Sequence, residues 1–100
     1  MTSPVRPDSS LLPRPHPDAV LAEVSDGAVL YLPETEHYFG LSPVAVQIWR
    51  MLPSSTTVGD LCARLSELYD GVPMDALRAD VSELLSELER MRLATAHVTA

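Results

Sequence analysis

The spacing of the apolar residues changes at Leu41-Ser42-Pro43, and this change constrains the fold more than any other feature of the chain. Before it, short runs rich in Val, Leu and aromatic residues are separated by turn signals, a pattern typical of β-strands. After it, apolar residues recur every three or four positions, which is typical of amphipathic helices. Strands followed by helices predict an α+β domain.

Two strands are predicted over residues 19–24 and 28–32, joined by a tight turn at Asp26-Gly27. A primed β-turn needs positive φ, which glycine adopts without steric cost. A second turn over residues 33–36 leads into a third strand, HYFGL, at residues 37–41. The three strands predict an antiparallel meander, and helices covering one face would stabilise so small a sheet.

Three helices are predicted after the strands. The first begins at Ser42-Pro43, where serine can cap the helix and proline occupies its first turn, and it ends at Pro53. The second begins at Thr57, whose hydroxyl stands at capping-box spacing from a carboxylate, and ends at Asp70-Gly71. The third extends over residues 73–92. The second and third helices with their short turn predict a helix-turn-helix core.

The apolar stripes of the last two helices predict the core of the domain. They are Val58, Leu61, Cys62, Leu65, Leu68 and Tyr69 on the second helix, and Leu77, Val81, Leu84, Leu85, Leu88 and Met91 on the third.

The chain is long enough for one modest core, so a single domain over residues 19–94 is expected. Residues 1–18 hold five of the nine prolines, which remove amide donors and disfavour helix and central strand. We therefore predict a flexible proline-rich tail before the domain. Residues 95–100 are expected to form a frayed tail after it.

The charge of the chain disfavours nucleic acid as a partner. The net charge is −7, and the seven basic residues are all arginines. The predicted third helix carries more acidic than basic residues, whereas a DNA-recognition helix needs the opposite balance to contact phosphates. No apolar run is long enough for a membrane span or a signal peptide, so we expect a cytoplasmic protein without a membrane partner.

No catalytic constellation is visible in the sequence. It contains no nucleophile paired with a base, no metal-ligand spacing among its three histidines, and no glycine-rich phosphate loop. The single cysteine, Cys62, lies on the apolar stripe of the second helix, where a buried structural thiol is expected. We therefore predict that the protein is not an enzyme and binds no metal or cofactor.

The stretch from Gly27 to Ala94 resembles the PqqD-like family, the small leader-recognition domains that act on ribosomally made, modified peptides. The resemblance lies in an ordered series of motifs: DGAVLYLP, HYFGLS leading into AVQIWRML, TTVGDLCARLSELY, and DVSELLSELERMRLA. Serine stands at position 42, where the family commonly has asparagine after the leucine. Arg92-Leu93 stands where Gly-Leu is frequent, which leaves the exit from the third helix open.

The resemblance implies a three-stranded antiparallel β-meander packed on a three-helix winged helix-turn-helix, without enzyme activity. It implies that a leader peptide adds an antiparallel strand to the third strand and places side chains in a cleft beside the third helix. The positions that match this docking edge are Glu36, His37, Tyr38, Phe39 and Gly40. The positions expected on the helix wall are Met74, Leu77, Arg78, Asp80, Val81 and Leu84. Of these, Leu77, Val81 and Leu84 are also expected as core residues that form only the floor of the cleft.

The sequence is compatible with several functions. The resemblance favours an adaptor that presents the leader of a precursor peptide to a separate leader peptidase or other modifying enzyme, in lasso-peptide biosynthesis. Similar domains serve radical-enzyme pathways of the pyrroloquinoline quinone type. A winged-helix DNA-binding regulator and a purely structural subunit of a larger enzyme are also compatible with the predicted fold.

Overall fold

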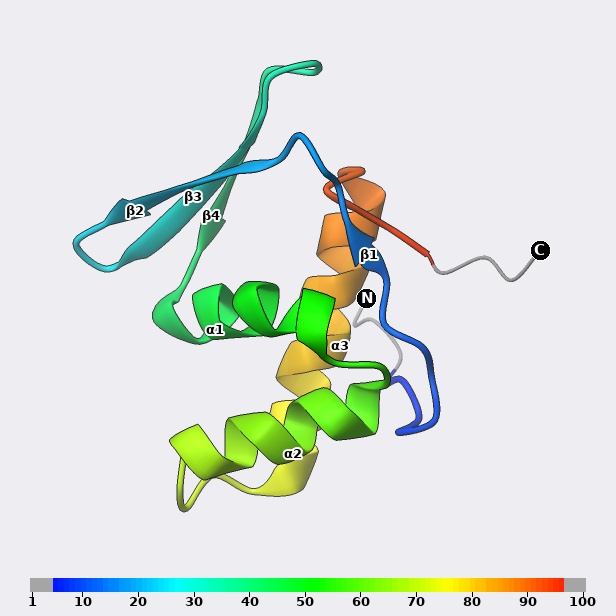
Figure 1. The fold of residues 1–100 in the computed structure, drawn as a ribbon. Helices are drawn as coiled ribbons and strands as arrows, with labels where there is room; N and C mark the ends of the chain where they lie inside the picture. The colour runs from blue at the N-terminus through cyan, green and yellow to red at the C-terminus, as the bar shows by residue number, and fades with distance from the viewer. Residues whose placement is uncertain (1–4, 97–100) are drawn as a thin grey trace.

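The structure of the protein is a computed structural model that describes residues 5–96 (Figure 1). In chain order, the elements are β1 (Arg14–Pro15), β2 (Val20–Val24), β3 (Gly27–Leu32), β4 (His37–Leu41), α1 (Pro43–Met51), a short 3-10 helix η1 (Leu52–Ser54), α2 (Val58–Leu68), α3 (Met74–Arg90) and β5 (Ala94–Thr95). The predicted α+β class, with three antiparallel strands and three helices, is confirmed.

The main sheet has the strand order β2-β3-β4, and both pairs are antiparallel. The two residues between β2 and β3 are Ser25 and Asp26, so the turn lies one residue before the predicted Asp26-Gly27 pair. Gly27 is the first residue of β3 and has a φ of 137°, which favours glycine. The register places Leu30 opposite Phe39 and Ala28 opposite Leu41. Because the strand order ends with β4, this strand lies at the edge of the sheet and pairs with β3 on one side only.

The core lies between the sheet and the helices. Alternate residues of β3 are buried, and they pack with the apolar faces of the three helices. Among the most deeply buried side chains are Leu30, Leu32, Ile48, Val58, Leu61, Leu65, Val81, Leu85, Leu88 and Leu93. Leu68 differs from the predicted stripe: it is the last residue of α2 and is 56% exposed.

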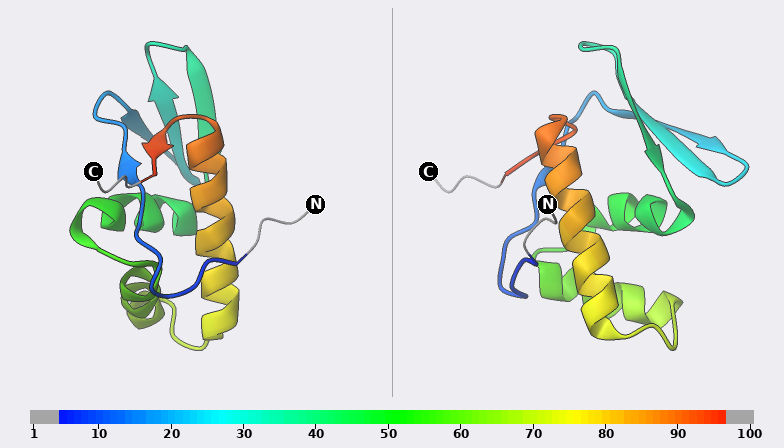
Figure 2. Two further views of the ribbon diagram at one scale, coloured as in Figure 1. Left: turned by 90° about the vertical axis from the view of Figure 1, so that its right-hand side faces the viewer. Right: turned by 180° about the vertical axis from the view of Figure 1, so that it is seen from behind.

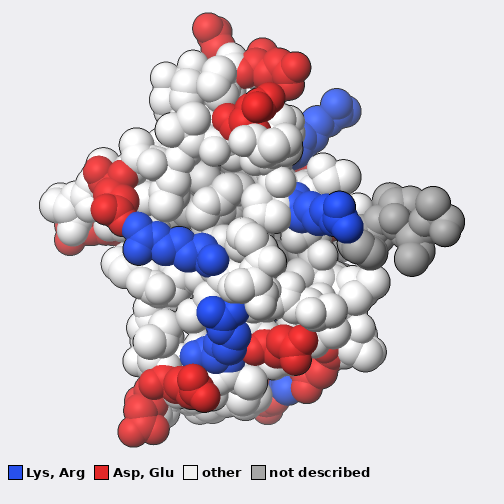
Figure 3. Space-filling model, viewed as in Figure 1, with Lys and Arg blue, Asp and Glu red and all other residues white. Residues whose placement is uncertain are grey.

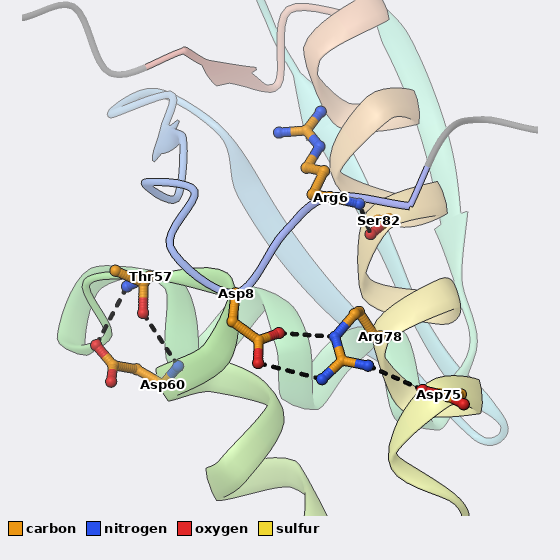
Figure 4. Close-up of polar contacts among 7 residues, drawn as sticks. All are labelled: Arg6, Asp8, Thr57, Asp60, Asp75, Arg78 and Ser82. Carbon is orange, nitrogen blue, oxygen red and sulfur yellow. Dashed lines mark hydrogen bonds and ion pairs between the residues drawn. The ribbon is translucent and has the colours of Figure 1, made fainter.

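The capping signals act as predicted. The Ser42 hydroxyl accepts a hydrogen bond of 3.2 Å from the backbone N–H of Ala45, with Pro43 in the first turn of α1. Thr57 and Asp60 form a reciprocal capping box at the start of α2, each side chain accepting from the backbone N–H of the other at 3.2 Å (Figure 4). These bonds satisfy backbone donors that a helix start would otherwise leave unpaired.

The chain leaves α3 through a Schellman motif. Arg92 adopts a left-handed φ of 61°, and the backbone N–H of Leu93 donates to the carbonyl of Leu88 at 2.9 Å. The N–H of Arg92 donates to the carbonyl of Glu89 at 3.1 Å. Arg92 therefore takes the positive φ at the position where the resemblance implies a frequent glycine, and α3 ends at Arg90.

Residues 6–15 lie against the helices rather than apart from them (Figure 2). Leu12 is only 5% exposed and belongs to the core. Three backbone hydrogen bonds of 2.9–3.1 Å join residues 8–12 to residues 56–59. The prolines of this stretch lack amide donors, but Ser10 and Leu12, which lie between them, donate their backbone N–H groups in hydrogen bonds. The described part of the predicted tail is thus in contact with the domain, while residues 1–4 lie outside the described residues.

The segments at the two ends of the described chain pair with each other. β1 and β5 form a two-stranded antiparallel sheet in which Arg14 lies opposite Thr95. The N–H of His16 donates to the carbonyl of Leu93 at 2.8 Å. Part of the predicted C-terminal tail is therefore also paired, and residues 97–100 lie outside the described residues. The domain limits at residues 19 and 94 stay a prediction.

Candidate functional site

The free edge of β4 is the first feature of the site. β3 pairs with one side of β4, and within residues 5–96 no strand pairs with the other side. An edge strand directs alternate backbone N–H and C=O groups outward, where another extended chain can bond to them. β4 therefore offers a template for strand addition.

A groove of about 390 Å³ lies beside one end of this edge. Its walls come from β4, α1 and α3, and its lining residues are Phe39, Gly40, Ser42, Val44, Ala45, Ile48, Asp80, Glu83, Leu84 and Glu87. Apolar side chains from all three elements line it, and the three carboxylates come from α3. The groove can accept an apolar side chain beside an acidic wall.

A second hollow of about 790 Å³ lies beside the other end of β4. It is lined by Thr35, Glu36, His37, Tyr38, Arg90, Met91 and Arg92. The start of β4 therefore lies near the end of α3, and the end of β4 lies near the middle of α3. In the view from behind, the two elements run in opposite directions, with α1 near the lower end of β4 (Figure 2).

The predicted docking edge lies along these two hollows. Glu36, His37, Tyr38 and Gly40 are exposed, and Phe39 is half-buried. Tyr38 is 66% exposed, and its ring stacks on that of Tyr31 from β3, with ring centroids 4.7 Å apart. Four of the five predicted positions thus lie on β4, and Glu36 is the last residue of the turn before it; their role in docking stays a prediction.

The predicted helix wall divides between different sides of α3. Asp80 and Leu84 line the groove. Leu77 and Val81 are 2% and 0% exposed and belong to the core. Met74, the first residue of α3, is exposed and does not line the groove.

Arg78 lies on the opposite face of α3 from the groove, because two residues along a helix correspond to a rotation of about 200° from Asp80. Its guanidinium donates to the Asp8 carboxylate, from Nε at 2.7 Å and from Nη2 at 3.2 Å, and to Asp75 at 3.0 Å (Figure 4). These hydrogen bonds lower the pKa of Asp8. Arg78 therefore holds the N-terminal segment instead of facing the groove.

Sequence reasoning missed Glu83 and Glu87, which line the groove together with Asp80 and Leu84. The signal was available in the helical period, because positions 80, 83, 84 and 87 share one helix face. It also missed the contribution of α1, whose Val44 and Ala45 lie there because Ser42 starts the helix directly after the edge strand.

Charge is distributed unevenly over the surface. On the face shown in Figure 3, acidic side chains gather at the top, over the turn between β3 and β4, and at the lower left, near the turn between α2 and α3.

Across the part of the chain that the structure describes, no group of three His, Cys, Asp or Glu side chains is placed to hold a metal ion. None of the helices in residues 5–96 is both long and apolar enough to cross a bilayer.

A family model described as coenzyme PQQ synthesis protein D (PqqD) matches residues 27–94. This chain belongs to the PqqD family. The resemblance predicted from its motifs is confirmed, and the match covers β3 to the start of β5, including every residue that lines the groove. No curated protein matches the chain.

Two solved structures share the PqqD-type fold of this chain. One is described as TbiB1 in complex with the TbiA(beta) leader peptide; it is 23% identical, with a TM-score of 0.72 over 86% of this chain and 99% of that chain. The other is described as lasso peptide synthetase B1 complexed with the leader peptide; it is 23% identical, with a TM-score of 0.66 over 81% of this chain and 94% of that chain. At this identity the likeness shows the fold.

Proposed function

We propose that this PqqD-family protein is a non-catalytic adaptor in lasso-peptide biosynthesis. It binds the leader region of a ribosomally synthesised precursor peptide and presents it to a separate leader peptidase or other modifying enzyme. The observation that carries the proposal is the free edge of β4 beside a groove formed with α1 and α3. Both solved structures of this fold are described as complexes with leader peptides, which supports the same use of the fold here.

The leader adds to β4 as a fourth, antiparallel strand. The sheet is antiparallel throughout, so an antiparallel strand continues its hydrogen-bond pattern. Backbone hydrogen bonds supply affinity in this binding mode, and pockets for alternate side chains supply specificity. The apolar lining of the groove, including Phe39 and Leu84, receives a leader side chain that faces the helices.

The protein acts by binding and positioning, without catalysing a reaction. Cys62 is 1% exposed, and burial raises the pKa of its thiol, so it is poorly placed to act as a nucleophile. The adaptor works in the cytoplasm and needs neither metal nor cofactor for this role. A related role in a radical-enzyme pathway is the second candidate, supported by the description of the family as a PQQ synthesis protein.

A fluorescence-anisotropy titration tests the proposal. The probe is a labelled leader peptide from a precursor gene adjacent to the gene for this protein, and a scrambled peptide is the control. We expect saturable binding at micromolar Kd or tighter, which corresponds to about −8 kcal/mol or better. Equal and weak signals from both peptides would contradict the adaptor role.

Two further variations test the binding mode. Methylation of single backbone nitrogens in the leader should weaken binding at alternate positions only, because an added strand directs every second N–H toward β4. Ala45→Trp should weaken binding because Ala45 lines the groove, whereas Ala63→Trp, on the exposed side of α2, should not. Loss of affinity in both variants, or in neither, would argue against binding in the groove.

A further inference from the structure

The charge of α3 and of the residues directly after it changes sign along the edge of β4. Asp80, Glu83 and Glu87 line the groove at the Gly40 end. Arg90 and Arg92 line the hollow at the other end, where His37 begins the strand. A peptide that lies along β4 therefore passes an acidic stretch of helix and then a basic one.

Most of these charges are available to a ligand. Among residues 5–96, the ion pairs include none to Asp80, Glu83 or Arg92, and all three residues are exposed. Glu87 pairs with Arg90 at the point where the sign changes, so these two charges largely offset each other. At the other end Glu36 also lines the hollow, so with Arg90 paired the hollow keeps one arginine, Arg92, against one carboxylate. The groove keeps the two carboxylates of Asp80 and Glu83, so the acidic charge lies at the groove end of β4.

Antiparallel addition fixes which end of the peptide meets which charge. The N-terminal half of the added strand lies beside Gly40, and its C-terminal half lies beside His37. Glu83 and Arg90 are seven positions apart on α3, which corresponds to about 10 Å along the helix axis. A strand covers that distance in about three residues, and side chains two or four positions apart share one face.

We propose that this charge order selects leader peptides with a basic side chain in the N-terminal half of the docked strand and an acidic one two or four residues later. The inference rests on the proposed function and names the peptide class of the same site. The correct order places each peptide charge beside an opposite charge on α3, while a reversed strand or a swapped order places like charges together. The charges thus act together with the apolar groove in setting the direction and the register of the strand.

The test compares peptides of identical composition. The probes are the leader peptide that binds in the titration above and two synthetic variants of it. One variant carries lysine at the position facing the acidic stretch and glutamate four residues later, and the other carries the same two residues in swapped order. At low salt we expect the first to bind about tenfold more tightly, since two exposed pairs change from attractive to repulsive. The difference should shrink as the salt concentration rises.

Protein variants locate the effect. Asp80→Asn combined with Glu83→Gln keeps side-chain size, so it should fold normally and reduce the preference for the lysine-first peptide. Glu67→Gln, on the exposed surface of α2, is the matched control and should leave the preference unchanged.

The outcomes separate the two proposals. Tight binding of the natural leader with equal affinity for both charge orders would overturn this inference and leave the adaptor function standing. A preference that survives in the Asp80/Glu83 double variant would also overturn it. No binding of the leader or of either variant would overturn the adaptor function and this inference together.

Discussion

Asp8 accepts two hydrogen bonds from the Arg78 guanidinium, across seventy positions of sequence, at 2.7 and 3.2 Å. A second contact lies further along α3, where the backbone N–H of Arg6 donates to the Ser82 hydroxyl at 2.9 Å (Figure 4). The Arg6 side chain also pairs with Glu89. These contacts all lie on the side of α3 that faces away from the groove. The N-terminal segment thus packs on the face of α3 opposite the groove and helps to hold this helix, which carries the acidic residues of the groove, in place.

Asp8→Asn should lower the stability of the protein at neutral pH. The Arg78 hydrogen bonds lower the pKa of Asp8, so the folded state favours the ionised carboxylate. A lowered pKa stabilises the folded state above the pKa of the unfolded chain, and this stabilisation is lost as the pH falls through the folded value. The difference between wild type and Asp8→Asn should therefore be present at pH 7 and disappear in acid below about pH 4.

Urea denaturation at several pH values measures this difference. The effect should be small, because the pair is at the surface and screened by solvent. Asp70→Asn is the control, since Asp70 is exposed and makes no ion pair among the described residues. An equal loss in both variants, or a loss for Asp8→Asn that persists in acid, would argue against the ion pair.

Gly27→Ala should destabilise the protein by about 1–3 kcal/mol. Gly27 has a φ of 137°, which other residues rarely adopt, and a Cβ there would collide with the carbonyl oxygen of Leu41 on the neighbouring strand. Gly40→Ala is the matched control, because a Cβ at Gly40 meets nothing within 4 Å. Chemical denaturation of both variants checks the prediction, and equal stability of the two would contradict the close approach of Gly27 to β4.

The thiol of Cys62 should react slowly with a thiol reagent in the native protein and rapidly in denaturant. It is 1% exposed, and burial raises its pKa. A raised pKa stabilises the folded state fully below the pKa of an unfolded cysteine, and this contribution is lost as the pH rises from there through the folded value. Stability should therefore decline in alkali in wild type, and this part of the decline should be absent in Cys62→Ala.

Absorbance of the released thiol product, followed over time at pH 8 with and without urea, measures the reactivity. Fast native labelling, at the rate seen in urea, would show that Cys62 is accessible. Melting of wild type and Cys62→Ala across the alkaline range tests the pH dependence separately.

Much of the local structure was predictable because its causes are local. Ser42-Pro43 and the Thr57 capping box start α1 and α2 as expected, since a cap needs only neighbouring residues. The Asp-Gly turn signal between two apolar runs likewise predicted the hairpin of β2 and β3. The edge position of β4 followed from three consecutive strands with short turns.

The candidate site was only partly predictable. The five edge positions over residues 36–40 are contiguous in sequence, so locating the strand located them all. The helix wall required the rotation of α3 relative to β4, which is set by core packing of Leu77 and Val81 against the rest of the domain. For this reason Asp80 and Leu84 lie in the groove, while Arg78 does not.

By itself, the sequence determined the order and type of the three main strands and the three α-helices, the caps of α1 and α2, and the family to which the chain belongs. Tertiary structure alone decided that residues 6–15 pack on the helices, that Arg78 binds Asp8, and that Glu83 and Glu87 line a groove beside β4. The physical reason is the distance along the sequence between the residues that interact. Caps, turns and periodicity depend on residues a few positions apart, whereas these contacts depend on how separate elements pack in space.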